Sequence, residues 1–270
     1  MIASVQSFNI NNHLEKEYRM KKLLLVTVFG LCLITAAHAA DQKVTWITST
    51  GVQSEYLAKI GVILSDSPVS ISFVEANYKD FYGGLWNATT LGGDEYGTTY
   101  GDEWDIYGGW AHTFGPVKLN LSAAYFAMTE LDETSDDMWV TDQELSLPKM
   151  PFVQPYIASR YFGSVGSSWR EGWFVFGGLR KSITLGQWTA KRPVALNLEA
   201  STAYSAGALR DFTGFVYGRF TTSLDIPLSK SVTLSPNLVY QIPASGQRNN
   251  PNGFTDRNKF VFGGKITWIF

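Results

Sequence analysis

The stretch that most constrains the fold lies at the carboxyl terminus, in residues 256–270. Counted back from Phe270 in steps of two, the positions as far as Phe260 hold aromatic residues, isoleucine and glycine, whereas the intervening positions are mixed and include Lys259 and Lys265. A repeat of two is that of a β-strand, because successive side chains point to opposite faces. A strand of about ten residues with an apolar, aromatic-ended face and a polar face can cross a bilayer in a tilted barrel.

The chain before this stretch repeats the alternating pattern, with turn signals between the segments. Segmentation predicts an all-β transmembrane antiparallel up-and-down β-barrel of about twelve strands. The predicted strands are 44–56, 69–78, 81–89, 104–114, 117–128, 139–146, 152–162, 173–183, 194–204, 212–226, 232–242 and 257–270. The alternation is least secure in 44–56 and 139–146, so ten strands is the alternative. An even number returns both chain ends to one side, as in single-chain bacterial barrels.

The connectors between these segments differ in length in a regular way. Mostly short connectors, four of the five containing proline, lie at 79–80, 115–116, 147–151, 185–193 and 227–230. They alternate with connectors that include long polar runs at 91–103, 130–137 and 243–255. Outer-membrane barrels show this asymmetry, with short periplasmic turns and longer outer loops.

Four segments show the clearest alternation: 117–128, 194–204, 212–226 and 232–242. In 212–226, for example, Val216 and Phe220 share the outward face and Arg219 the inward one. A polar interior separates a membrane barrel from a soluble β-sandwich, the alternative fold, whose inside would be apolar. Segment 69–78 breaks frame at Glu75, which indicates either a bulge or a different register.

Two resemblances support the barrel fold. Phe270 and the alternating aromatics before it resemble the last strand that bacterial outer-membrane barrels present to their assembly machinery. The runs F-Y-G-G-L-W (81–86) and D-I-Y-G-G-W-A-H-T-F-G-P (105–116) resemble an uncharacterised family of exported bacterial proteins with glycine–aromatic strands. That resemblance covers roughly residues 44–128. It implies an outer-membrane barrel and no established activity or site.

The amino-terminal region predicts export. Residues 20–39 combine a basic M-K-K start, an apolar run and an A-x-A site ending at Ala39, which is the pattern of a cleaved signal peptide. A lipoprotein site at Cys32 is disfavoured because the apolar run continues behind it. Residues 1–19 indicate an upstream start or an irregular extension, and residues 40–270 the barrel. The expected location is the outer membrane of a Gram-negative bacterium.

Composition excludes several kinds of chemistry. The single cysteine, Cys32, lies in the predicted signal peptide, so a disulfide framework, a thiolate metal site and a cysteine nucleophile are not expected. A formal net charge of −2 gives no reason to expect nucleic acid as a partner. No cofactor and no metal are predicted. The expected partners are outer-membrane lipid and lipopolysaccharide, the barrel-assembly machinery at the last strand, and a small polar solute.

Histidine-dependent catalysis, as in barrel phospholipases, lipid A deacylases and omptin-like proteases, would need His112. It shares the outward face with Trp110 and Phe114, so a non-enzymatic protein is predicted. Acidic residues gather in two outer loops and predict a solvated rim; the spacing of a preorganised calcium loop is missing. They are Asp94, Glu95, Asp102, Glu103, Glu130, Asp132, Glu133, Asp136 and Asp137.

Inward charges are the feature most informative about function. They either pair and fill the lumen or line a narrow pore. The sequence predicts a monomeric, narrow, passive, porin-like channel for small polar or anionic solutes; the alternatives are a closed barrel with a structural or surface-interaction role and, third, a barrel enzyme. The candidate lumen residues are Lys118, Glu199, Arg219, Asp225, Arg257, Lys259 and Lys265.

Overall fold

The chain divides into two units, Met1–Val44 and Thr45–Phe270. The computed structural model describes residues 44–91, 103–128, 137–164, 170–187, 192–208, 212–245 and 257–270. The expected extension at 1–19 and the expected signal peptide at 20–39 therefore lie outside the described residues. The same holds for the acidic loop residues Asp94, Glu95, Asp102, Glu130, Asp132, Glu133 and Asp136.

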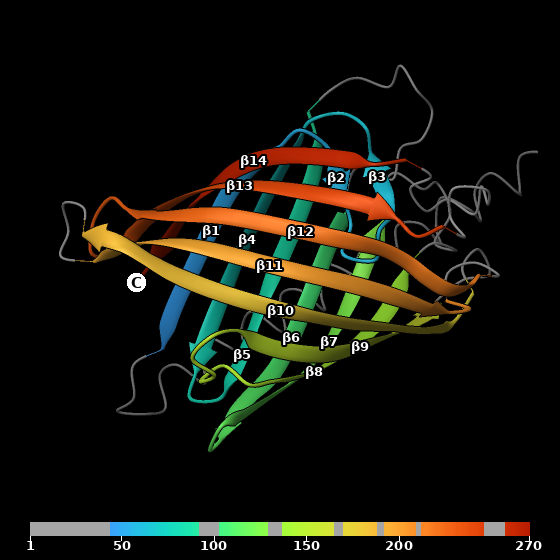
Figure 1. Cartoon of the computed structure of the whole chain (residues 1–270), viewed down its shortest axis with the longest axis horizontal. Helices are drawn as coiled ribbons and strands as arrows, with labels where there is room; N and C mark the ends of the chain where they lie inside the picture. The colour runs from blue at the N-terminus through green and yellow to red at the C-terminus, as the bar shows by residue number, and fades with distance from the viewer. Residues whose placement is uncertain are drawn as a thin grey trace, which may run out of the picture. The chain divides into compact units, whose positions relative to one another are not determined.

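Residues Thr45–Phe270 form a closed antiparallel barrel of twelve strands (Figure 1). The predicted up-and-down barrel is confirmed, the two least secure strands are present, and the ten-strand alternative is wrong. The barrel strands are β1 (Thr45–Gln53), β4 (Val69–Tyr78), β5 (Phe81–Thr90), β6 (Glu103–Phe114), β7 (Val117–Met128), β8 (Met138–Ser146), β9 (Gln154–Ser164), β10 (Gly172–Gln187), β11 (Pro193–Ala206), β12 (Thr213–Pro227), β13 (Val232–Pro243) and β14 (Lys259–Ile269). Between β1 and β4, the short strands β2 (Tyr56–Leu57) and β3 (Ile63–Ser65) pair separately.

The last strand has the two faces that its sequence predicts. Phe260 and Phe262 on the outward face are 56% and 60% exposed, whereas Val261 between them is buried. β14 closes the barrel against β1, where Trp46 and Phe270 exchange main-chain hydrogen bonds of 3.2 and 2.9 Å. Closure pairs the strand edges with each other, which a strand surrounded by lipid requires.

The barrel has two different ends, and Figure 1 labels the strands that run between them. At the turn end, tight hairpins join β4 to β5 and β6 to β7, with positive φ angles of 55° at Lys79 and 61° at Gly115. The loop end is the opposite one, where β1 leads into β2 and β3. Described residues contain no helix long and apolar enough to cross a membrane.

The frame break at Glu75 was predicted to mark a bulge or a different register, and the structure shows a different assignment of faces. β4 pairs with β1 and β5 without any shift in register, so Glu75 marks no bulge. Instead Ile71, Phe73 and Glu75 all face the lumen cavity, and Ile71 packs against a buried cluster that contains Tyr56. Ile71 therefore lies inside because another segment of the chain covers it.

The predicted outward position of Val216 is wrong, because its side chain is buried. The pairing of β11 with β12 shifts register between Ala203 and Tyr204, whose partners are Tyr217 and Phe215. This irregularity leaves Val216 without a partner in the register, as the extra residue of a bulge. Its side chain joins the apolar cluster at the loop end.

Candidate functional site

The segment between β1 and β4, residues 54–68, crosses the lumen and is called the crossing loop. At its tip Ile60 is 7% exposed and packs in a cluster with Phe174 and Phe176 of β10 and with Phe162 of β9. In the strand order, β9 and β10 lie on the side of the barrel opposite β1 and β4. The loop therefore reaches from the wall that carries it to the far wall.

The tip of the crossing loop is a tight turn that requires glycine. Ala58 N–H donates to the Val62 carbonyl at 2.9 Å, and Gly61 N–H to the Ala58 carbonyl at 3.0 Å. Gly61 has a φ of 92°, which disfavours a side chain. A Cβ atom there would also lie 2.6 Å from Cδ1 of Tyr217, so the barrel wall leaves no room for it.

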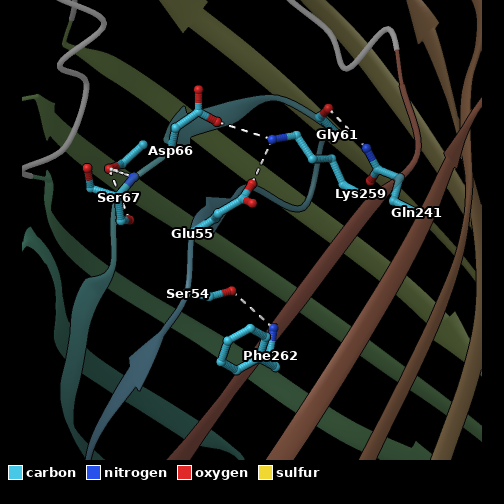
Figure 2. A network of polar contacts seen from close by, with 9 residues as sticks. Ser54, Glu55, Gly61, Asp66, Ser67, Gln241, Lys259 and Phe262 are labelled. Atoms are coloured by element: carbon cyan, nitrogen blue, oxygen red, sulfur yellow. Dashed lines mark hydrogen bonds and ion pairs between the residues drawn. The ribbon is translucent and has the colours of Figure 1, made fainter. Parts of the chain in front are cut away.

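Three side chains of β12 and β13 hold the tip through its carbonyl oxygens, and we call them the docking trio: Tyr217, Arg219 and Gln241. The Tyr217 hydroxyl donates to the Lys59 carbonyl at 2.6 Å. Arg219 Nη2 donates to the Ala58 carbonyl at 2.8 Å. Gln241 Nε2 donates to the Gly61 carbonyl at 3.3 Å, as Figure 2 shows. Main-chain acceptors thus hold the tip, in addition to the packing of the Ile60 side chain.

An ion-pair latch, made by Lys259 with Glu55 and Asp66, holds both arms of the crossing loop. Lys259 Nζ lies 2.8 Å from Glu55 Oε2 and 3.2 Å from Asp66 Oδ1, between the two acids in Figure 2. The Lys259 side chain is 11% exposed and that of Glu55 22%, so this pair is partly shielded from solvent. Next to it, Ser54 Oγ accepts a hydrogen bond from Phe262 N–H.

Tyr56 anchors the loop to a third wall. Its hydroxyl donates to Glu103 Oε2 at 2.5 Å. Burial, together with the nearby carboxyl groups of Glu103 and Asp105, raises the pKa of Tyr56 well above its usual value. Glu103 was predicted in an exposed rim, but it is a buried residue of β6. Asp137, predicted in the same rim, is also buried and accepts a hydrogen bond from Tyr125.

A charge ladder runs across β8 to β11 on the inner wall. Arg160 makes two hydrogen bonds to Asp142, of 2.8 and 2.7 Å. Arg180 makes two to Glu144, of 2.7 and 3.1 Å, and one to Glu199 of 3.1 Å. Each guanidinium thus faces at least one carboxylate in the two-point geometry that makes such pairs strong.

The crossing loop and the barrel wall together line a cavity of about 1030 Å³. Tyr82, Trp86 and Tyr107 line it on β5 and β6, while Asn237 and Lys265 line it on β13 and β14. The Lys265 side chain is exposed, and the described residues offer it no ion pair or hydrogen bond. A charge in that position requires water around it.

The candidate lumen residues occupy different places. Arg219 belongs to the docking trio, Lys259 to the latch, Glu199 to the ladder and Lys265 to the cavity wall. Asp225 accepts hydrogen bonds from Asn197 at 2.8 Å and Ser235 at 2.6 Å. Lys118 is exposed and shares the inward alternation of β7 with Ser122, whereas Arg257 is exposed and precedes β14. The structure therefore distributes these charges rather than gathering them at one site.

Sequence reasoning missed the ladder and the crossing loop. In β10 the run Phe174–Val175–Phe176 is apolar on both faces, so no face could be chosen for Arg180. The crossing loop is docked through backbone carbonyls, which no side-chain pattern reveals. Gly61 between apolar neighbours was the one available signal, because an isolated glycine can mark a close approach.

His112 lies on the outward face near the turn end, as its alternation predicts. Its ring lies 5.7 Å from that of Trp110 and 4.5 Å from that of Phe114. Its Nδ1 lies 2.8 Å from Asp80 Oδ2, across the adjoining hairpin. Within the described ranges, no group of three or more histidine, cysteine or acidic residues could hold a metal ion.

Comparison with known proteins identifies the fold and no more. No family model matches the chain, and no curated protein matches it. The structure of the KdgM porin aligns with a TM-score of 0.50 at 7% identity, covering 84% of this chain and 99% of that one. The structure of the NanC porin aligns with a TM-score of 0.50 at 7% identity, covering 83% of this chain and 98% of that one. The structure of an outer-membrane channel from Pseudomonas putida F1 aligns with a TM-score of 0.51 at 12% identity, covering 86% of this chain and 97% of that one.

Proposed function

We propose that the protein is a narrow passive channel of the bacterial outer membrane that passes small polar or anionic solutes and has no catalytic role. The observation that carries the proposal is the lumen cavity of about 1030 Å³ with an exposed Lys265 on its wall, which has no ion pair or hydrogen bond among the residues that the structure describes. An ammonium group held inside a barrel favours anions along the path. The crossing loop makes this path narrow.

Single-channel conductance in a planar bilayer tests the channel. We expect small, resolvable conductance steps in potassium chloride and a reversal potential on the anion side in a salt gradient. Lys265→Glu should move the reversal potential toward cations, because it inverts the charge at this position of the cavity wall. Lys149→Glu makes the same substitution at an exposed residue next to a turn, so it should shift the potential less.

A closed barrel with a structural or surface-interaction role is the second candidate, and the docked crossing loop is the observation that favours it. The two functions separate in a variant whose residues 55–66 are replaced by two glycines. Gln53 and Val69 are register partners, so a short hairpin can join β1 to β4. Conductance in both proteins supports the channel. A silent wild type with a conducting variant would assign the closed barrel instead.

Export, location and partners belong to the same proposal. The signal peptide at 20–39, the outward aromatics and Phe270 support an outer-membrane protein that contacts lipid and lipopolysaccharide and is inserted by the assembly machinery at β14. The protein should fractionate with outer membranes and migrate differently on gels after heating. Folded protein recovered from the periplasm without detergent would contradict the location.

A further inference from the structure

Arg219 differs from the other arginines of the inner wall. Arg160 and Arg180 each face carboxylates at hydrogen-bond distance. Among the described residues, no carboxylate lies within ion-pair distance of Arg219. The nearby Glu199 is engaged by Arg180 and Tyr156 instead. In the part of the chain that the structure describes, the hydrogen-bond acceptors of this lumen cation are thus all neutral oxygens.

Those acceptors are the Ala58 carbonyl and the Gln241 side-chain oxygen. Arg219 Nη2 donates to Ala58 at 2.8 Å, and both Nε and Nη2 donate to Gln241 Oε1. The guanidinium also lies 4.3 Å from the ring centre of Tyr217. Because an arginine fork matches the geometry of a carboxylate, a neutral carbonyl uses only part of its capacity.

The docking trio as a whole is a set of donors. A guanidinium, a phenol and an amide converge on the carbonyls of residues 58, 59 and 61, within one turn of chain. Such a set, aimed at oxygen atoms, would also bind the carboxylate of a small solute. In the docked state the crossing loop places its own oxygens there.

We propose that the docking trio is a binding site for carboxylate-bearing solutes, masked by the crossing loop, and that such a solute displaces the loop tip. This inference rests on the proposed channel and deepens it, since it names the solute class and the residues that recognise it. The loop carbonyls occupy the positions that the carboxylate oxygens would take. Loop and solute compete, so a bound carboxylate favours the open path.

Thiol accessibility at the loop tip tests the competition without relying on conduction. Cys32→Ser removes the native cysteine and Ile60→Cys places a thiol where the side chain is buried. Iodoacetamide labelling is then followed in detergent micelles, and an exposed Met150→Cys gives the unprotected rate. The probe is gluconate, compared with sorbitol as its uncharged analogue and with chloride at equal ionic strength.

Gluconate should accelerate labelling of Ile60→Cys, by about tenfold at ten times its dissociation constant. Sorbitol should have no effect and chloride little. Arg219→Gln should label faster without solute and respond no further to gluconate. Lys265→Gln, which removes a lumen cation outside the trio, should keep the response to gluconate.

Three results would overturn the carboxylate site: no acceleration by gluconate, equal acceleration by chloride, which would indicate screening of the latch, or a gluconate response that survives in Arg219→Gln. Folding of each variant is checked by its heat-dependent gel migration. A gluconate response in a protein without conductance would reject the channel and keep the site. Conductance without a response to gluconate would reject the carboxylate site and keep the channel.

Discussion

At Gly61 one hydrogen atom in place of a side chain decides whether the crossing loop can dock. The positive φ and the contact with Tyr217 both exclude a Cβ atom at this position. The φ angle is a property of the loop backbone, whereas the contact involves a side chain of the barrel wall. Repacking Tyr217 would therefore leave the backbone constraint in place. The docked position of the loop tip therefore depends on one backbone conformation.

Gly61→Ala should release the tip of the loop. The conformational cost alone is about 1–2 kcal/mol, which corresponds to roughly 5–30-fold faster labelling of Ile60→Cys, and the clash adds to it. Gly218→Ala is the matched control on β12, because a Cβ there meets nothing within 4 Å. An unchanged labelling rate in Gly61→Ala would show that the loop tip is not fixed by this residue.

Tyr56 should make docking sensitive to alkali. Because its pKa is raised in the docked loop, the docked form holds the phenol proton more tightly than the free loop does. Docking is therefore fully stable below the free tyrosine pKa of about 10 and weakens as pH rises above that value. Iodoacetamide labelling of Ile60→Cys between pH 9 and 11 measures this. We expect the labelling rate to rise with pH by more than the ionisation of the thiol explains, and Tyr56→Phe should abolish this additional rise. If the additional rise persists in Tyr56→Phe, another group causes it.

At the scale of elements, the latch and the ladder stabilise different parts of the structure. The latch joins β14 to the arms of the crossing loop, whereas the ladder joins neighbouring strands β8 to β11. Loss of the first should change the position of the loop, and loss of the second the stability of the barrel.

Lys259→Met should loosen the loop by about 1–2 kcal/mol, because it removes both ion pairs from the arms. We expect roughly tenfold faster labelling of Ile60→Cys with little change in the urea midpoint of the barrel. Lys230→Met, in an exposed turn, serves as the control. If the midpoint falls and the labelling does not change, Lys259 supports the barrel wall rather than the loop.

Arg180→Met should lower the free energy of unfolding by roughly 1–3 kcal/mol, since Glu144 and Glu199 lose their shared partner. Glu144→Gln should cost less, because Arg180 keeps Glu199. A double-mutant cycle in urea, with the barrel in lipid vesicles, isolates the Arg180–Glu144 pair. Additive effects of the two substitutions would show that this pair contributes no coupling.

The elements differ in how far their sequence predicts them. β7 and β14 alternate cleanly because their outward faces are apolar and exposed and their inward faces carry polar lumen groups, as their sequences predict. The faces of β4 were harder to predict because apolar side chains lie inside the barrel: Ile71 packs against the cluster that contains Tyr56, and Phe73 lines the lumen cavity. A period-two pattern reports which side is apolar, and it cannot tell lipid from a protein segment that enters the lumen.

At the scale of the whole molecule, the strand number and the closure follow from local patterns, whereas the contents of the lumen do not. Arg219 was predicted inside from its alternation alone. Its partners are the carbonyl of Ala58 and the side chain of Gln241, and Ala58 lies 161 residues away in sequence. Contacts at such sequence separation depend on the path of the crossing loop, which the alternating pattern does not predict.

These long separations in sequence imply an order in which the contacts of the crossing loop form during folding. The crossing loop follows the first strand, yet the trio that holds its tip lies 158 to 180 residues later, on β12 and β13. Contacts between distant parts of a chain wait for the chain between them to be in place. A chain whose last strands have not yet joined therefore holds an undocked crossing loop, and docking is among the last contacts to form.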